Sequence, residues 1–304
     1  MNRTPRAWII VTTARIIPGR ICAMNRTSLP MRSKRSPAFE SSVPGKRLLI
    51  PEAGASSSSS VGLDAQGTEF ILRAYDGGLR FGRVATMGRQ GLHQTVPQLE
   101  ELQKKMAERG FPNEDWREWV CGTGGMCEGF LKRLGASEVV SFDKSGYEGA
   151  TNIVDLNEPL QDSELVEGFD TAIDGGTLEH VFNALEAWNT ACRMVKVGGH
   201  LIAITPANNQ CGHGFYQFSP EFFFALLHET RGWTIQVAEY FHAGAFHKLE
   251  NPAEAGERLE SLSALGGPLY LYFIAKKTAA GSNAPFPQQS DYSRMWRDYE
   301  MKIA

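Results

Sequence analysis

Three signals that would each indicate a class of protein are missing from this sequence of 304 residues. No apolar run approaches the roughly 18 residues that a membrane-spanning helix needs, so we expect no membrane-embedded segment. The five cysteines form no C-x-x-C pair and their number is odd, which favours a reducing compartment and argues against a bound metal. No G-x-G-x-x-G motif follows the first expected strand, which argues against a dinucleotide-dependent oxidoreductase.

Acidic residues are almost absent from the first 50 residues, which hold ten of the 31 Lys and Arg residues but only one of the 34 Asp and Glu residues. The rest of the chain is therefore acidic, with 21 bases against 33 acids, and we expect no nucleic-acid partner. A basic segment rich in Ser, Thr and Pro is typical of an organelle transit peptide. It is also typical of a disordered tail, or of a chain whose true start is Met24 or Met31. We expect a cytoplasmic protein, with organelle import through this segment as the alternative.

The composition divides the chain into three parts. Residues 1–62, which contain a run of five Ser, are expected to be a disordered extension. Residues 63–278 have the ordinary composition of a folded domain. Residues 279–304 begin as a polar linker and end in an amphipathic helix, which we expect to pack onto the domain, with a partner contact as the alternative. The apolar residues of this helix recur at helical spacing: Tyr292, Met295, Trp296, Tyr299 and Ile303.

The stretch from Phe169 to Pro206 carries the clearest structural signal. Two short apolar runs flanked by Gly, at 169–173 and 201–204, have the pattern of buried strands. Between them, apolar residues at helical spacing predict a helix that ends at Gly198-Gly199. A strand, a helix and a strand within about 35 residues predict a βαβ unit with parallel strands.

The remaining pattern predicts five more strands and the helices between them. The strands are expected at 83–87, 139–143, 151–157, 233–240 and 269–275. The helices are expected near 68–75, 97–109, 126–134 and 222–229, the last capped by Ser219. This alternation predicts an α/β fold: a Rossmann-like, seven-stranded, mostly parallel sheet with helices on both faces.

The string FD…DGGTLEHVFN…RMVKVGGHLIAITP, within 169–206, resembles the second half of class I S-adenosylmethionine-dependent methyltransferases. The strings GYEGA at 146–150 and GHGFYQFSP at 212–220 resemble an uncharacterised methyltransferase-like subgroup, and the resemblance covers about 83–240. It implies a seventh strand that runs antiparallel beside the sixth, and S-adenosylmethionine as the cofactor. We expect a small-molecule substrate as the methyl acceptor. The resemblance implies nothing about the identity of that acceptor.

Two glycine turns compete to be the cofactor loop that this family places after its first strand. The turn Gly88-Arg89-Gln90 follows the strand at 83–87 and resembles that of some relatives. The turn at 122–125 is closer to the usual glycine-rich loop, but two charges interrupt the strand that it would need, at 116–120. We favour Gly88, Arg89 and Gln90, although the family normally supplies two or three glycines here. Arg89 would pair with the carboxylate of the cofactor, or with a neighbouring acid, Asp174.

Acidic residues follow three successive strands, and the carboxyl ends of parallel strands meet at one edge of a doubly wound sheet. Asp143 is expected to accept the ribose hydroxyls of the cofactor, because a carboxylate can bind both. The resemblance assigns Asp155 to the adenine amino group and the backbone amide of Leu156 to the adenine ring. It places Asp174 and Gly175 beside the amino-acid part of the cofactor.

The loop at 208–219 is expected to lie over the acceptor side of this edge, because it follows the fifth strand. His213 lies between two glycines in this loop and is a candidate general base. Tyr216 is a candidate for contact with the methyl sulfonium. The alternative is that the aromatic residues of the loop pack in the core while His213 makes a structural hydrogen bond. His180 belongs to a Leu-Glu-His turn and is expected mainly to pack at the start of the helix.

The sequence therefore favours an S-adenosylmethionine-dependent methyltransferase that acts on a small-molecule oxygen or nitrogen. A methyltransferase-like domain that has lost catalysis and serves as a binding or scaffold module is the alternative. A dinucleotide oxidoreductase is the least favoured hypothesis.

Overall fold

The computed structural model describes residues 62–255, 258–281 and 287–303. The predicted extension at 1–62 lies outside the described residues except for its last residue. None of the described helices is both long enough and apolar enough to cross a membrane.

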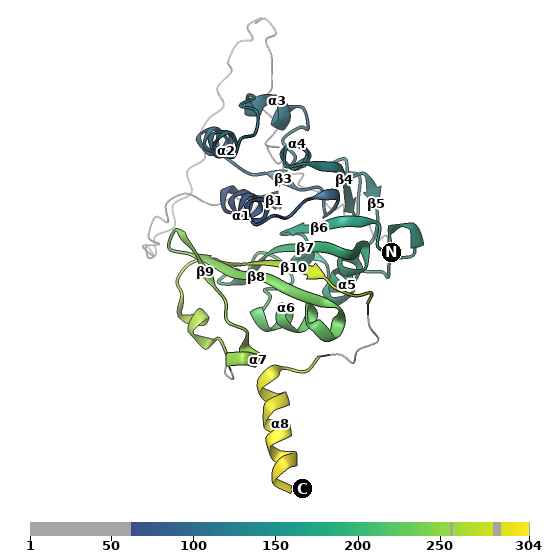
Figure 1. Cartoon of the computed structure of the whole chain (residues 1–304), viewed down its shortest axis with the longest axis vertical. Helices are drawn as coiled ribbons and strands as arrows, with labels where there is room; N and C mark the ends of the chain where they lie inside the picture. Colours follow the sequence, from purple (N-terminus) through teal and green to yellow (C-terminus); the bar gives the residue numbers. More distant parts are fainter. Residues whose placement is uncertain (1–61, 256–257, 282–286, 304) are drawn as a thin grey trace, which may run out of the picture. The chain divides into compact units, whose positions relative to one another are not determined.

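Eight strands form one sheet in the order β5-β4-β2-β6-β7-β10-β8-β9 (Figure 1). The first five strands in this order are parallel, whereas β10 is antiparallel to both β7 and β8. The predicted Rossmann-like α/β sheet is thus confirmed, including the antiparallel strand. Along the sheet, the bounds are β5 Asn152–Ile153, β4 Ala136–Asp143, β2 Gly82–Met87, β6 Phe169–Gly175, β7 Val195–Asn208, β10 Leu269–Lys277, β8 Trp233–His242 and β9 Ala245–Lys248.

The eighth strand, β9, corrects the predicted count of seven. It forms a hairpin with β8, in which His242 pairs with Ala245. Both residues of the connecting turn have positive φ, 51° at Ala243 and 83° at Gly244. A two-residue loop with this geometry follows the twist of the flanking strands. The sequence pattern did not reveal it because Ala is an unusual residue at positive φ.

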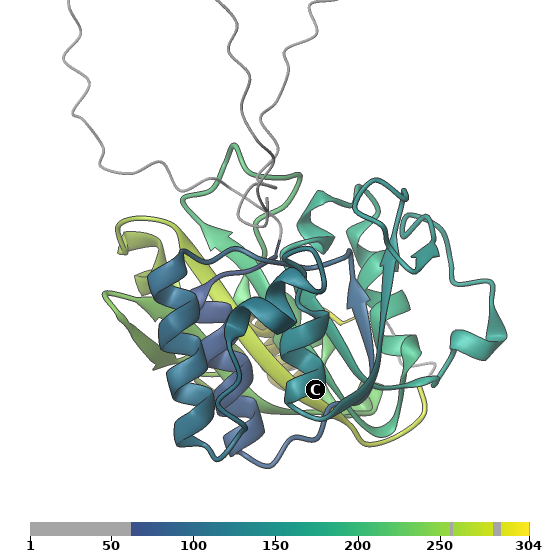
Figure 2. The same ribbon diagram turned by 90° about the horizontal axis from the view of Figure 1, so that it is seen from above.

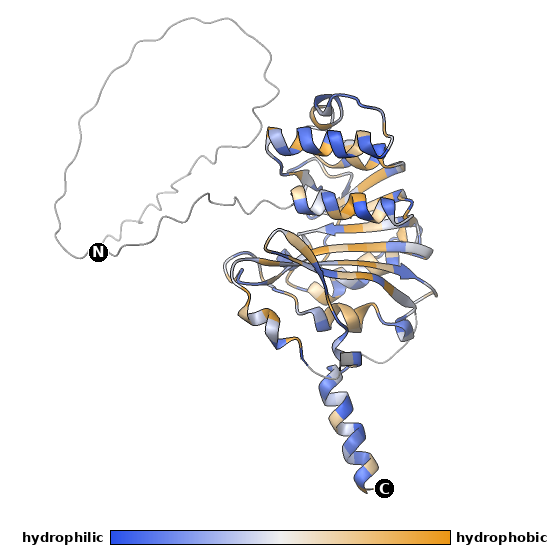
Figure 3. Ribbon diagram, turned by 60° about the vertical axis from the view of Figure 1, so that its left-hand side comes forward, coloured by the Kyte–Doolittle hydropathy of each residue, from blue (hydrophilic) through white to orange (hydrophobic). Residues whose placement is uncertain are grey.

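Helices cover both faces of the sheet (Figures 1 and 2). One hydrophobic core lies under α1–α4, and a second lies under α5 and α6. Figure 3 shows the hydrophobic strands between helices whose outer surfaces are more hydrophilic. The helices are α1 Ala65–Asp76, α2 Val96–Glu108, α3 Trp116–Cys121, α4 Glu128–Arg133, α5 Ala184–Met194, α6 Pro220–Leu226, α7 Pro252–Ala255 and α8 Ser290–Ile303. Two short segments, β1 Gly62–Leu63 and β3 Gly91–Leu92, form a separate parallel pair.

The alternative first strand at 116–120 is wrong, because these residues form α3. Asp115 caps this helix by accepting a hydrogen bond from the amide of Arg117. The first strand of the sheet is therefore β2, and the turn that follows it begins at Gly88. The predicted cap of α6 is confirmed, since Ser219 accepts the amide of Glu221 at 3.2 Å.

The structure differs from two expectations, one about a helix boundary and one about the packing of the C-terminal helix. The helix in the βαβ unit ends at Met194 rather than at Gly198, because Val195 is already extended and begins β7. The C-terminal helix forms as α8, and ion pairing of Arg258 with Asp291 holds its first turn. None of the described residues of α8 is buried, so packing of its apolar side chains onto the domain is not observed.

We predict that Gly88→Ala destabilises the fold more than Gly110→Ala. Both glycines have positive φ, 73° and 84°, so each alanine should cost about 1–2 kcal/mol of backbone strain. A Cβ at Gly88 would in addition collide with the Oγ1 of Thr177, whereas nothing lies within 4 Å of a Cβ at Gly110. Denaturant unfolding of both variants measures the difference. Equal losses of unfolding free energy would contradict close packing at Gly88.

Candidate functional site

The register of three parallel strands brings the predicted site residues to one edge of the sheet. Met87 of β2 lies beside Phe142 of β4 on one side and beside Asp174 of β6 on the other. The amide of Gly88 donates to the carbonyl of Phe142 at 2.7 Å. Asp143, Gly88 and Asp174 therefore follow one another in this order across the carboxyl edge. The strand order also reverses at β2, which is where ligands bind in folds of this type.

The carboxylate of Asp143 is half-exposed at this edge. Among the described residues it accepts one long hydrogen bond, from the amide of Ser145 at 3.3 Å. Glu148 lies in the same loop, and its partial burial and the nearby Asp143 raise its pKa. Asp143 thus keeps lone pairs that are free to accept further hydrogen bonds.

Asp155 lies two residues beyond β5, which is shorter than the predicted strand. Its carboxylate is paired with Lys144 and accepts hydrogen bonds from Asn157. These contacts lower the pKa of Asp155 to about 2. The Asp155 carboxylate can therefore bind a ligand only in competition with Lys144. The side chain of Leu156 is buried in the core.

Arg89 is engaged with the protein itself, though not with Asp174. Its Nε forms an ion pair with Glu128 of α4 at 2.6 Å, and its Nη1 donates to the carbonyl of Glu148 at 2.8 Å. Arg89 thus ties the start of α4 to the loop after β4.

Gln90 is fully buried beneath the same turn. Its amide nitrogen donates to the carbonyl of Met87 and to the Oγ1 of Thr177, the latter at 2.9 Å. Its Oε1 lies 2.7 Å from the position that a Cβ on Gly175 would take. Gly175 is therefore required by the close approach of Gln90, whose side chain fills the space at the end of β6.

The side chain of Asp174 is fully buried and organises the turn that follows β6. Its Oδ1 accepts the amides of Thr177 and Leu178, each at 3.1 Å. Burial and the nearby carboxylate of Glu179 raise the pKa of Asp174 well above its ordinary value. The Asp174 side chain supports the Leu178–His180 turn and does not face the solvent-exposed edge.

The loop at 208–219 is fixed to this turn by its backbone. The carbonyl of Glu179 accepts the amides of Phe215 at 2.9 Å and Tyr216 at 3.2 Å. The hydroxyl of Tyr216 donates to the carbonyl of Phe182 at 2.6 Å. A Cβ on Gly214 would lie 2.9 Å from the carbonyl oxygen of Glu179, so only glycine permits this approach. The structure therefore brings His213 and Tyr216 onto the Leu178–His180 turn.

His213 and His180 both face the carboxylate of Glu179, which is 0% exposed. The Oε1 of Glu179 lies 3.4 Å from the Nε2 of His213 and 3.9 Å from the Nε2 of His180. The Glu179 carboxylate raises the pKa of His213, whereas burial lowers the pKa of His180. The two imidazole rings are 4.9 Å apart. Sequence reasoning treated Glu179 as part of a structural turn and did not join it to His213, because no pattern links the two segments.

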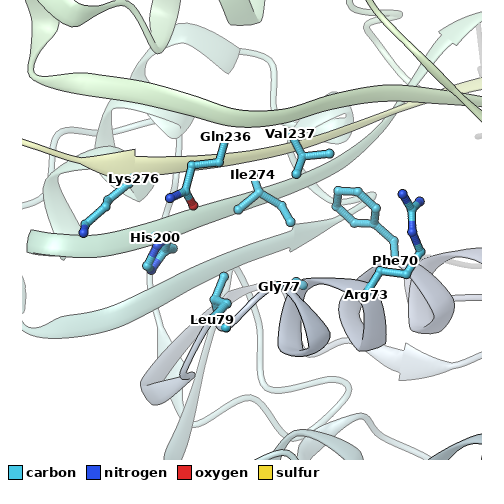
Figure 4. A pocket seen from close by; sticks show the side chains of 11 residues that line it. Phe70, Arg73, Gly77, Leu79, His200, Gln236, Val237, Ile274 and Lys276 are labelled. Atoms are coloured by element: carbon cyan, nitrogen blue, oxygen red, sulfur yellow. The ribbon is translucent and has the colours of Figure 1, made fainter.

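A cavity of about 460 Å³ lies elsewhere, between α1 and the strands β7, β8 and β10 (Figure 4). His200, Gln236 and Lys276 line it together with apolar residues of α1 and its neighbours. His200 pairs with Thr171, near the start of β6, so this cavity is at the opposite end of the strands from Gly88. None of the predicted site residues lines it.

No protein-family model matches this chain, and no curated protein matches it. The chain does match solved structures, among them several methyltransferases. One is the 1,6-didemethyltoxoflavin-N1-methyltransferase of Burkholderia thailandensis, solved with S-adenosylhomocysteine, at 12% identity and a TM-score of 0.38, covering 71% of this chain and 79% of that one.

Two further matches are similarly distant. The N-methyltransferase NodS of Bradyrhizobium japonicum is 12% identical, with a TM-score of 0.38 and coverage of 69% and 94%. An S-adenosylmethionine-dependent methyltransferase of Mesorhizobium loti is 15% identical, with a TM-score of 0.36 and coverage of 70% and 97%. All three are methyltransferases, the family that the motifs of this sequence resemble.

We predict that Gly214→Ala detaches the loop at 208–219 from the Leu178–His180 turn, whereas Gly212→Ala does not. The new Cβ at 214 would collide with the carbonyl of Glu179, while a Cβ at 212 meets nothing within 4 Å. Amide hydrogen exchange at Phe215 and Tyr216, which both donate to that carbonyl, measures the effect. Exchange should accelerate at least about tenfold in Gly214→Ala, as expected for the loss of about 1.4 kcal/mol of local stability. Unchanged protection in that variant would contradict the close approach.

Proposed function

We propose that this chain is an S-adenosylmethionine-dependent methyltransferase that acts on a small-molecule acceptor. The observation that carries the proposal is the pairing of a positive-φ glycine turn at Gly88 with the half-exposed carboxylate of Asp143, at the edge where the strand order reverses. Glycine at positive φ lets the backbone approach a ligand closely. The neighbouring carboxylate supplies what a ribose requires, two acceptors for vicinal hydroxyl groups.

The residues at this edge fit a nucleoside that carries an amino-acid arm. Asp143 would hold the ribose hydroxyls, because its carboxylate accepts one long hydrogen bond from the described residues. The backbone of Leu156, beside Asp155, would hold the adenine. Arg89 would meet the carboxylate of the cofactor with the guanidinium nitrogens that Glu128 and Glu148 do not use.

Other residues shape this site without a direct bond to the cofactor. The buried side chains of Asp174 and Gln90 hold the ends of β6 and β2 in place. Gly175 leaves the room that Gln90 needs. Rigid support of this kind keeps the residues that touch a ligand in position.

The acceptor would lie beside the loop at 208–219. When bound, S-adenosylmethionine supplies an electrophilic methyl group, and this chain has to align the acceptor with it. Alignment of two reactants contributes up to about 7–11 kcal/mol to a barrier reduction. Glu179 orients the imidazole of His213, which is suited to accept a proton from an acceptor that arrives protonated. Tyr216 is held in place by its hydrogen bond to Phe182 and would line the same side.

We predict that the full chain binds S-adenosylmethionine and S-adenosylhomocysteine with micromolar affinity and does not bind NAD. Asp143→Ala should weaken the binding about 10- to 150-fold, since a hydrogen bond to a charged group contributes about 1.5–3 kcal/mol. Glu138→Gln is the matched control, because Glu138 lies on the same strand but pairs with Arg83 near its other end. Isothermal titration calorimetry measures all three proteins. The ribose assignment fails if Asp143→Ala binds as tightly as the control.

A binding or scaffold domain without catalysis is the second candidate. It is favoured by one observation: the side chains of Arg89 and Gln90 occupy the turn where the family normally has glycines. In that case, Arg89 is a structural bridge between α4 and the loop after β4, and it obstructs the cofactor.

The variant Arg89→Ala separates the two candidates. For a methyltransferase, we predict that it weakens S-adenosylmethionine binding by about tenfold, because a charge-assisted bond to the cofactor carboxylate is lost. For a scaffold domain, the unaltered protein does not bind S-adenosylmethionine. Arg89→Ala then either still does not bind it, or begins to bind it because the obstructing side chain is gone. Arg117→Ala is the control, since Arg117 forms an exposed ion pair with Asp115 on α3. The same calorimetric titration reads out both outcomes.

A further inference from the structure

We propose that Glu179, His180 and His213 form a binding site for one divalent first-row transition-metal cation, such as Zn²⁺. This site differs from the expectation drawn from the cysteines, which argued against a bound metal. It uses no cysteine, and its ligands come from two segments more than 30 residues apart in the sequence.

The three side chains already lie close to the geometry of a metal site. Their ligand atoms all lie within 4.8 Å of one another. The Oε1 of Glu179 is 3.4 Å from the Nε2 of His213 and 3.9 Å from the Nε2 of His180. Ligand atoms that bind one zinc ion at about 2.0–2.2 Å lie roughly 3–3.5 Å from each other. Small rotations of the imidazole rings would therefore complete the site without movement of the backbone.

Buried polar atoms of this cluster lack hydrogen-bond partners among the described residues. The carboxylate of Glu179 is 0% exposed, and its nearest partner among the described residues is the Nε2 of His213, at the long distance of 3.4 Å. Neither carboxylate oxygen accepts a well-formed hydrogen bond from these residues, and the buried Nε2 of His180 has no hydrogen-bond partner among them. Buried polar groups rarely lack such bonds, because burial removes their hydration. A cation bound between them would satisfy the carboxylate and the imidazole together.

A second buried carboxylate, that of Asp174, lies close to Glu179. Asp174 interacts electrostatically with Glu179, and its Oδ2 also has no hydrogen-bond partner among the described residues. A hydrogen bond from His213 would satisfy one oxygen of Glu179. It would leave the second oxygen of Glu179, the Oδ2 of Asp174 and the Nε2 of His180 without a partner among the described residues. One divalent cation bound to Glu179 would use both imidazoles.

The backbone holds the three ligands in place independently of a bound ion. The carbonyl of Glu179 accepts two amides of the loop that carries His213, those of Phe215 and Tyr216. Gly214 allows this loop to approach the Nδ1 of His180, which lies 3.1 Å from where its Cβ would be. Preorganisation of this kind is what a metal site needs from its second shell of contacts.

The ligand types indicate the class of metal. Two imidazoles and one carboxylate favour zinc, iron, cobalt or manganese over magnesium and calcium, which take mainly oxygen ligands. Three protein ligands leave at least one coordination position for water or a substrate atom. That open position would be on the side of His180, whose side chain is 34% exposed, rather than His213, at 8%.

The metal site also narrows the chemical class of the methyl acceptor. This inference rests on the proposed function. An acceptor with a hydroxyl or carboxylate oxygen would suit the open position on the side of His180. The Nε2 of His213 cannot bind a cation and donate a proton to Glu179 at the same time. Metal content therefore decides whether this nitrogen is a metal ligand or the group through which Glu179 orients the imidazole.

The test is a titration of the full chain, stripped with a chelator and dialysed, with Co²⁺ and then Zn²⁺. We expect one equivalent of Co²⁺ to produce the visible absorption of an imidazole-bound ion, and one equivalent of Zn²⁺ to abolish it. Glu179→Gln and His213→Gln should each weaken binding at least about 100-fold, since even outer-shell substitutions cost 10- to 100-fold. The matched control His242→Gln changes a histidine on β8 and should bind as the unaltered protein does.

A second measurement guards against variants that fail to fold. In the unaltered protein, the ring nitrogens of His180 and His213 should shift together in NMR spectra when one equivalent of Zn²⁺ is added, while those of His228 and His247 should not. The proposal is overturned by a cobalt spectrum equal to that of the free ion, by unshifted His180 and His213 rings, or by full affinity in Glu179→Gln. Titration of the metal-free protein with S-adenosylhomocysteine tests the proposed function separately. Metal binding without cofactor binding would remove only the methyltransferase proposal, and the reverse would remove only the metal site.

Discussion

The parallel register of β4, β2 and β6 is the constraint on which the rest of this structure depends. Because Met87 lies level with both Phe142 and Asp174, the chain has to turn away from the sheet at Gly88, directly beside two acidic residues. Backbone amides then hold each strand end: Gly88 donates to Phe142, and Thr177 donates to Asp174. The edge is therefore rigid at β2 and β6, while the carboxylate of Asp143 stays available to a ligand.

Burial divides the acidic residues into two groups with different roles. Asp143 and Asp155 are accessible enough to exchange their partners for a ligand. Asp174 and Glu179 are fully buried, and each retains oxygen atoms without a hydrogen-bond donor among the described residues. A pair of buried carboxylates is costly to a fold, so its presence beside two imidazoles points to a role beyond stability.

Local patterns were sufficient to predict the α/β fold and the position of the seventh strand, because apolar periodicity and glycine turns are local signals. The antiparallel direction of that strand came only from the resemblance to methyltransferases. The eighth strand was missed because its turn uses Ala243 at positive φ. Among the site residues, strand ends located Asp143 and Asp174, but the sequence could not say that Asp174 is buried. The contact of His213 with Glu179 depends on the path of the loop at 208–219, which no local pattern specifies. Arg89 pairs with Glu128 and with the carbonyl of Glu148, and these contacts are likewise known only from the packing of α4 and of the loop after β4.

The central claim is that a nucleoside cofactor binds at the edge formed by Gly88 and Asp143. Two-dimensional amide NMR of the full chain during titration with S-adenosylhomocysteine tests it most directly. The amide signals of Gly88 and Ser145, which lie beside the Asp143 carboxylate, should shift in a saturable way. That of Gly198, near the opposite end of the strands, should not move. Saturable shifts around the cavity lined by His200 and Lys276, with Gly88 and Ser145 unchanged, would contradict this account.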